Sequence, residues 1–480
     1  MWANRRNFTG VPYIDEHTDI QKVTNTVDIR GAVLADLRAG TELPLDMGQI
    51  GRFNKTVSQF LLAKALMAMT RSYDQALELL TEVATSGTNP AGEALGLEGR
   101  YGDIFDIEFR NGVEAVYTLQ YSVNDGSGGW NAGYGEVLNF PYKQGESPAG
   151  CCGFFQPTQE FVNSFRTRDG LPLLDFSYND PNQAVPSDIG IPTGDLWVDD
   201  DGDEASTMDE YRTGSVVRAA DPAQPYLDRA YRSLTGTWDE PNIGNDPLTH
   251  PEHWELLWVE DPSLEIDPRL DWSVGRRGIP YWDWGNHTGR DWIRDPSYAG
   301  PYSPKKQVYK KSQEGIYTEV GNWTSGYTAN GYRLIRYADV LLRKAECEAM
   351  LGVDDWGLAE VNAIRQRAAN PEGFVVEEDG STPAANYVIA PYPAFPDASY
   401  AMQAIRFERK LELGQEGHRY FDLQRWDLVP TEINRMLEYE KSMPWGGALY
   451  GGAIAGPEDV NYPIPQVILD QHEGRFVQNR

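Results

Sequence analysis

Apolar residues recur at helical spacing in residues 331–427. The first segment has apolar residues three, four, three and four positions apart, namely Ile335, Ala338, Leu342, Ala345 and Ala349. This spacing predicts an α-helix with one apolar stripe, whose alanines let a second helix approach closely. A second stripe follows after a short connection and consists of Leu358, Val361, Ile364 and Ala368. Together they predict two antiparallel helices, one unit of a helical repeat.

The rest of the chain alternates such patterns with long irregular stretches. Residues 55–70 and 73–83 are predicted helices, and residues 116–121 favour a β-strand. Residues from about 150 to 330 are rich in Pro, Gly, Asp and aromatic side chains. A structureless linker of that length is rare in a compact domain, so we expect an irregular layer with short helices that packs on the helical scaffold.

A third pattern lies between residues 400 and 428, where charged residues recur along a predicted helix. Glu408, Glu412 and Glu416 are four residues apart, and Arg406, Arg409 and Lys410 lie beside them. Side chains at this spacing are neighbours on one helix, which predicts ion pairs along its surface.

Several motifs occur in a fixed order in the same region. They are Arg336-Tyr337-Ala338-Asp339, Ala345-Glu346, Asn362-x-x-Arg365-x-Arg367-Ala368, Glu408-Arg409-x-x-Glu412, Glu416-Gly417-x-Arg419 and Asp422-Leu423-x-Arg425-Trp426. In this order and spacing the chain resembles the RagB/SusD family of outer-membrane nutrient-binding lipoproteins. Further matches near both ends extend the resemblance over nearly the whole chain.

The resemblance implies a mainly α, SusD-like fold. We expect a tetratricopeptide-like helical-repeat scaffold and an irregular, aromatic-rich layer with short helices and few strands. Residues 1–480 would form a single domain, with a discontinuous scaffold at 28–86, 331–369 and 400–428. The ligand-binding layer would comprise residues from about 100 to 330, with 370–399 and 429–480.

The resemblance also implies a function. Such a protein captures a glycan or oligosaccharide at the cell surface and delivers it to a SusC-like TonB-dependent outer-membrane transporter, without catalysis and without a cofactor. Family members are held at the outer membrane by a lipid anchor. The first residues contain no signal peptide or acylated-cysteine motif, so we expect that an N-terminal segment with the anchor is missing from this chain.

Two alternatives remain open. The first is a helical-repeat adaptor that binds only protein and has no glycan site. The second is a glycoside hydrolase, whose carboxylate pair the sequence cannot exclude. Because 72 acidic residues supply many such pairs, no pair stands out, and we predict no catalytic residue.

Charge narrows the set of partners. The chain has 42 basic and 72 acidic residues, a net charge of −30. Nucleic acid is therefore not an expected partner, since its binding depends on Lys and Arg. A polyanion would be repelled unless a local basic patch offsets the charge, so we expect a neutral or weakly charged oligosaccharide.

Membrane spans and metal sites are not predicted. The best apolar run is about half of the ~20 residues that a bilayer needs. Six scattered His give little support for a Cys/His metal site. The acidic run 199–204 lacks ligands at the first and last EF-hand positions, which favours a solvated turn over a calcium loop.

Tryptophan is concentrated in the irregular half. Six of the 14 Trp lie between residues 254 and 292. The apolar face of a pyranose stacks on aromatic rings while polar neighbours bind its hydroxyls, so these rings are candidate carbohydrate contacts. The alternative is that they form the core of a layer poor in aliphatic residues. The candidate contacts are Trp272, Tyr281, Trp282, Trp284 and Trp292.

Overall fold

The computed structural model describes most of the chain. The described residues are 10–133, 140–142, 152–186 without 182, 263–294, 300–321, 326–353, 355–443 and 445–478. The acidic run 199–204 and the tryptophans Trp254 and Trp258 lie outside these residues.

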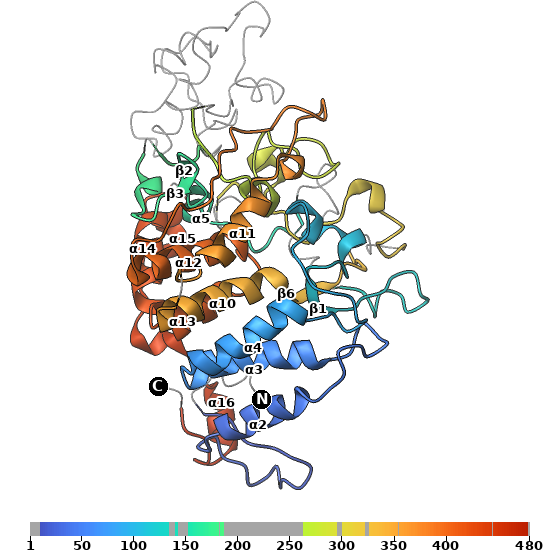
Figure 1. Cartoon of the computed structure of the whole chain (residues 1–480), viewed down its shortest axis with the longest axis vertical. Coiled ribbons are helices and arrows are strands. Elements are labelled where there is room, and N and C mark those ends of the chain that lie inside the picture. Colours follow the sequence, from blue (N-terminus) through green and yellow to red (C-terminus); the bar gives the residue numbers. More distant parts are fainter. Residues whose placement is uncertain are drawn as a thin grey trace, which may run out of the picture.

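A stack of α-helices forms the scaffold (Figure 1). Its members follow one another in space as α2 (Arg30–Gly40), α3 (Lys55–Met69), α4 (Tyr73–Ser86), α10 (Tyr337–Leu351) and α12 (Ala398–Glu412). α11 (Leu358–Ala368) packs against both α10 and α12. Helices from both halves of the chain thus share one layer, which confirms the mainly α, tetratricopeptide-like fold. The division of the chain into one domain with the bounds given above stays a prediction.

The predicted stripes lie in the helix interfaces. Val361 and Ile364 of α11 are buried in one cluster with Ala338, Leu342, Ala345 and Ala349 of α10, and Ala368 of α11 is buried as well. The apolar spacing predicts a helix that includes Ile335, but α10 begins only at Tyr337. Ile335 belongs to strand β6 (Tyr332–Arg336), which pairs antiparallel with β1 (Ala115–Leu119) and so takes its backbone hydrogen bonds from a strand.

A close contact between Ala345 of α10 and the start of α11 explains why position 345 is alanine. Gly357, the N-cap of α11, has a left-handed backbone with φ of 83°. A Cβ atom at Gly357 would lie 2.6 Å from the Cβ of Ala345. The two backbones therefore touch, and neither position has room for a larger side chain.

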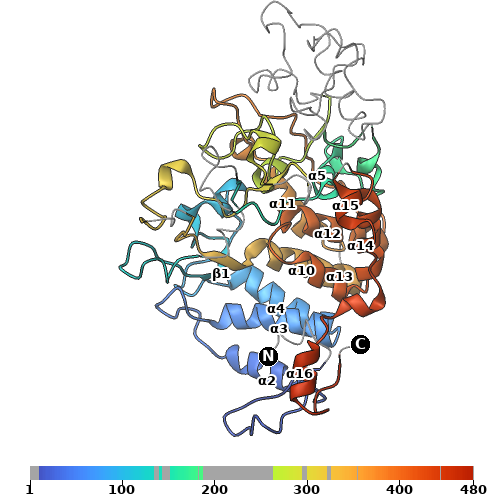
Figure 2. The same cartoon turned by 180° about the vertical axis from the view of Figure 1, so that it is seen from behind.

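The irregular layer lies beside and above the helices in Figure 1, and Figure 2 shows it from behind. Its short elements are α5 (Gln159–Asn163), β2 (Thr167–Arg168), β3 (Leu171–Pro172), α9 (Leu270–Ser273), β4 (Val274–Gly275) and β5 (Ser303–Pro304). Its 3₁₀ turns are η1 (Gly102–Phe105), η2 (Ile107–Phe109), η4 (Ser177–Asn179), η7 (Gly289–Trp292) and η9 (Lys311–Gln313). Strand β2 pairs with β3, and β4 with β5.

The C-terminal part covers one side of the stack. It comprises α13 (Arg419–Arg425), α14 (Val429–Glu440), α15 (Gly446–Tyr450), η11 (Pro457–Val460) and α16 (Gln466–Gln471), whereas the 3₁₀ turn η10 (Pro371–Gly373) lies between α11 and α12 and contacts Trp272 of the irregular layer. α14 packs against α5, α13 and α15. Figures 1 and 2 both show α16 beside α2, and near this end the Asn25 amide donates to the carbonyl oxygen of Val477 at 2.7 Å.

A network of ion pairs occupies the interior between the scaffold and the layer, and we call it the central network. Its carboxylates are Glu114, Asp267, Glu408, Glu412 and Glu416, and its cations are Arg269, Lys306, Arg336, Arg365 and Arg367. Five negative charges thus meet five positive ones, all nearly or fully buried.

The prediction of ion pairs along the surface of α12 is wrong for Glu408 and Glu412, which belong to the central network. Glu408 and Glu412 face inward and contact cations of other elements, not Arg406, Arg409 or Lys410. Spacing along one helix predicts only neighbours on that helix. Whether a carboxylate instead faces the core depends on arginines far away in the sequence.

Candidate functional site: a groove between α5 and α14

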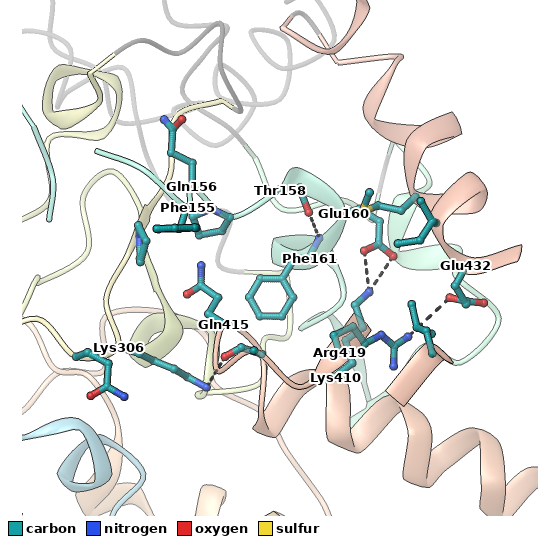
Figure 3. A pocket seen from close by; sticks show the side chains of 18 of the residues that line it. Phe155, Gln156, Thr158, Glu160, Phe161, Lys306, Lys410, Gln415, Arg419 and Glu432 are labelled. Carbon is teal, nitrogen blue, oxygen red and sulfur yellow. Dashed lines mark hydrogen bonds and ion pairs between the residues drawn. The ribbon is translucent and has the colours of Figure 1, made fainter. Parts of the chain in front are cut away.

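The described part of the protein contains an open groove of about 640 Å³ (Figure 3). Its walls come from the segment 155–161, from the turn 414–417 between α12 and α13, and from α14. Lining side chains include Tyr121, Phe155, Gln156, Thr158, Glu160, Phe161, Lys306, Gln307, Tyr332, Lys410, Gln415, Arg419, Glu432, Ile433, Arg435 and Met436. The volume lies in the range typical of small-molecule sites.

Aromatic rings form one part of the groove wall. The side chain of Phe155 is 67% exposed although it lines the groove, and its backbone is left-handed with φ of 58°. Phe161 lies deeper and packs edge-on against Phe165, with ring centroids 5.1 Å apart. The Thr158 hydroxyl caps the start of α5 by accepting from the Phe161 amide at 3.2 Å. An open aromatic surface therefore rests on a fixed helix start.

The turn 414–417 brings an amide group to the rings. Gln415 is exposed and has a left-handed backbone with φ of 64°. A Cβ at Gly414 would lie 2.3 Å from the Phe161 ring, so only glycine allows the turn to approach so closely. Lys306 holds the turn from below by donating to the Gly414 carbonyl and to the Glu416 carboxylate, both at 2.8 Å. The turn is thus anchored to the central network.

Charged side chains line the end of the groove near α14. Lys410 donates to both carboxylate oxygens of Glu160 at 2.8 Å, and Arg435 donates to the same carboxylate at 2.8 Å. Burial alone would raise the pKa of Glu160, but Lys410 and Arg435 outweigh it and lower the pKa to about 2. Figure 3 shows the Glu160–Lys410 pair at this end.

This arrangement suits binding more than catalysis. A glycosidase needs one carboxyl group held protonated near neutral pH and a second one that is ionised. The described carboxylates of the groove are Glu160 and Glu432, and each lies in contact with cations. The lowered pKa of Glu160 is the opposite of what the acid requires. In the described residues, no group of three or more His, Cys, Asp or Glu is placed to hold a metal ion.

The five aromatic residues predicted from the sequence lie near one another but not in the groove. The side chain of Tyr281 is fully buried and that of Trp292 is 5% exposed. Their rings pack edge-on at 5.9 Å, and the Tyr281 hydroxyl donates to the Pro304 carbonyl at 2.5 Å. Protein covers both rings in this structure, and a role of Tyr281 and Trp292 in ligand contact stays a prediction.

The other three are partly buried. The indole N–H groups of Trp272 and Trp284 donate to the backbone carbonyls of Gly373 at 2.7 Å and Tyr309 at 2.9 Å. Trp282 packs against Trp272 with centroids 5.0 Å apart. These contacts give the rings a packing role, and a role in ligand contact stays a prediction.

Sequence reasoning missed the groove residues. The available signals were short, namely the pair Phe154-Phe155 between a glycine and a proline, and the turn Gly414-Gln415-Glu416-Gly417. Neither is periodic, and the two are more than 250 residues apart in the chain. Only the fold brings them together.

A tetratricopeptide-like helical stack, an irregular layer and an open, partly aromatic groove define this class of helical-repeat protein. The sequence profile described as the SusD family, SusD_RagB, matches residues 113–479. The protein belongs to the SusD family. A search among curated proteins gave no significant match. No helix in the described residues is long and apolar enough to cross a bilayer.

Solved structures agree with this assignment. A SusD-like protein from Bacteroides fragilis is 16% identical with a TM-score of 0.57, and the alignment covers 99% of this chain and 76% of that one. A laminarin-binding SusD-like protein is 17% identical with a TM-score of 0.51, over 99% and 74% of the two chains. Surface glycan-binding protein A from Bacteroides thetaiotaomicron is 16% identical with a TM-score of 0.50, over 99% and 74%. At these identities the similarity establishes the fold.

Proposed function

We propose that this protein captures a glycan or oligosaccharide at the cell surface and delivers it, chemically unchanged, to a SusC-like TonB-dependent outer-membrane transporter. Membership of the SusD family supports this proposal. So do the names of two structural relatives, one laminarin-binding and one a surface glycan-binding protein. In this account the protein acts on the outer face of the outer membrane, held by a lipid anchor.

The groove is the candidate binding site, and Phe155 is the observation on which this rests. The phenyl ring of Phe155, 67% exposed, and the amide of Gln415 line the same groove and offer a sugar both a stacking face and a hydrogen-bonding partner. Both residues have left-handed backbones. Such strain persists only where the surrounding structure maintains it, and it is concentrated at functional sites.

The partly buried tryptophans form a second candidate site. Trp272, Trp282 and Trp284 remain proposed contacts, since each keeps some exposed surface. Tyr281 and Trp292 are left out because protein covers them. The two candidate sites share no residue, so single substitutions distinguish them.

A glycan array followed by calorimetry tests the binding proposal. Phe155→Ala should lower the affinity for the best array ligand about tenfold, which is the order of one lost stacking contact. Phe154→Ala is the matched control, because Phe154 is its neighbour in sequence and is 42% exposed but does not line the groove. Trp284→Ala tests the second site. An array without any bound glycan would refute the proposal, and full affinity in Phe155→Ala would refute the groove.

Delivery to a transporter needs a separate experiment. A lipidated, full-length version expressed beside its neighbouring gene should copurify with a β-barrel transporter in mild detergent. Recovery of the protein alone would contradict the proposed partnership. Copurification with the transporter, combined with no glycan binding, would favour the adaptor alternative.

A further inference from the structure

The charge of the groove differs in sign from that of the whole chain. The four cations that line the groove are Lys306, Lys410, Arg419 and Arg435, and its two carboxylates are Glu160 and Glu432. Lys306 is balanced by Glu416 just behind the wall. At the α14 end, three cations therefore face two carboxylates, an excess of one positive charge in a chain of net charge −30.

Arg419 is the cation of this end that is least engaged by carboxylates. One of its terminal nitrogens, Nη1, donates to the backbone carbonyl of Arg406 at 3.1 Å. The other, Nη2, lies 3.8 Å from Glu432, which is longer than a hydrogen bond. The Arg419 side chain is 33% exposed, whereas that of Glu160 is only 4% exposed. The Arg419 guanidinium, which lines the groove, therefore has N–H groups that can donate to a ligand.

A second guanidinium adds to the positive charge beside Arg419. The Nε of Arg406 is buried and makes no hydrogen bond among the described residues. Arg406 and Arg419 lie over the same Trp426 ring, at 5.2 and 6.0 Å from its centroid. Burial lowers the pKa of both arginines. An anion in this end of the groove would compensate the one positive charge that its lining residues leave in excess.

We propose that the α14 end of the groove binds the anionic group of an acidic oligosaccharide, with Arg419 as the main donor and Phe155 stacking on a sugar ring further along. The inference rests on the proposed function, because it assigns a ligand class to the same groove. It departs from the neutral ligand expected from the net charge, since a local basic patch governs binding at close range. Uronic-acid carboxylates and sugar sulfates share the anionic oxygens that a guanidinium recognises.

Calorimetry with matched ligands tests this inference. The probes are an oligogalacturonate, its neutral methyl ester, a sulfated oligosaccharide and the best neutral glycan from the array, each at low and high salt. We expect one acidic probe to bind about tenfold more tightly than any neutral one, with an advantage that shrinks as salt rises. The carboxylate and sulfate probes show which anion is preferred.

Variants locate the contact. Arg419→Gln should remove most of the acidic preference, while Arg71→Gln should not. Arg71 is the matched control because it pairs with Asp427 at 2.5 Å, outside the groove. Arg419 also donates to the Arg406 carbonyl, so Arg419→Gln could fail to fold. Arg419→Lys is the second variant for that case, because it keeps the positive charge. It should bind the acidic probes with reduced affinity but with the same salt dependence.

The outcomes separate the inference from the proposed function. Tightest binding of a neutral glycan, lost in Phe155→Ala, would overturn the acidic ligand and leave the proposed function standing. Salt-independent binding of the acidic probes by the wild-type protein would overturn it as well, without any variant. If no glycan of either kind binds, both proposals fail.

Discussion

Glu412 lies at the centre of the central network, and neutralising it tests how that network stabilises the fold. Its carboxylate contacts Arg367 at 2.6 Å and both Arg269 and Arg336 at 3.1 Å. All four side chains are at most 3% exposed. Glu412→Gln keeps the shape of the side chain but removes its charge.

The size of the effect follows from the charge balance. The central network pairs five carboxylates with five cations. Without the charge of Glu412, one positive charge stays buried and uncompensated. Removing one partner of a buried ion pair costs about 3–5 kcal/mol. We expect Glu412→Gln to lower the free energy of unfolding by about that amount.

Urea denaturation at neutral pH, followed by tryptophan fluorescence, measures the change. The matched control is Glu82→Gln, which breaks the surface pair of Glu82 with Lys55 at 2.8 Å. An exposed pair is worth about 0–1 kcal/mol, so the control should unfold almost like the wild type. Equal losses in the two variants, or a loss below about 1 kcal/mol for Glu412→Gln, would contradict a stabilising role of the Glu412 charge.

Three further predictions concern stability. Ala345→Trp should unfold or aggregate the protein because Gly357 lies against Ala345, whereas Ala359→Trp on the exposed side of α11 should be tolerated; thermal denaturation compares them, and a wild-type melting temperature in Ala345→Trp would contradict the packing. Since the pKa of Glu160 and that of Glu416 are lowered to about 2, the stability they contribute should be complete above about pH 4.5 and lost toward pH 2, and a flat melting temperature across that range would contradict this. Burial raises the pKa of Glu440 to about 7. The folded protein therefore disfavours the ionised form, and wild-type stability should fall as the pH rises from about 4.5 to 7. Glu440→Gln should raise the melting temperature at about pH 8 but not at about pH 4.5. Glu438 is an exposed neighbour of Glu440, and Glu438→Gln should leave the melting temperature unchanged at both pH values.

The helical scaffold could be predicted because its information is local. The apolar spacing at Leu358, Val361, Ile364 and Ala368 is that of one helix face. In α11 the last three of these residues are buried, and Leu358 is partly buried. The error at Ile335 arose because apolar spacing cannot show that a neighbouring strand, β1, takes the backbone hydrogen bonds. Local pattern thus fixes a helix better than it fixes where the helix begins.

The candidate site was not predictable in the same way. Tyr281 and Trp292 lie in an aromatic-rich segment, but composition cannot distinguish a ring packed in the core from one that faces a ligand, and both are buried. The groove joins Phe155 to Gln415 and Arg435, which follow it by more than 250 residues in the chain. Their juxtaposition depends on the close approach of Gly414 to Phe161, which no spacing rule contains.

The most direct test of the account is a crystal structure of the protein with the tightest oligosaccharide from the glycan array. The account predicts a sugar ring against Phe155, within hydrogen-bonding distance of Gln415, in the groove between α5 and α14. A sugar bound over Trp272, Trp282 and Trp284 would contradict the groove and support the second candidate site, and a sugar bound at any other surface would contradict both.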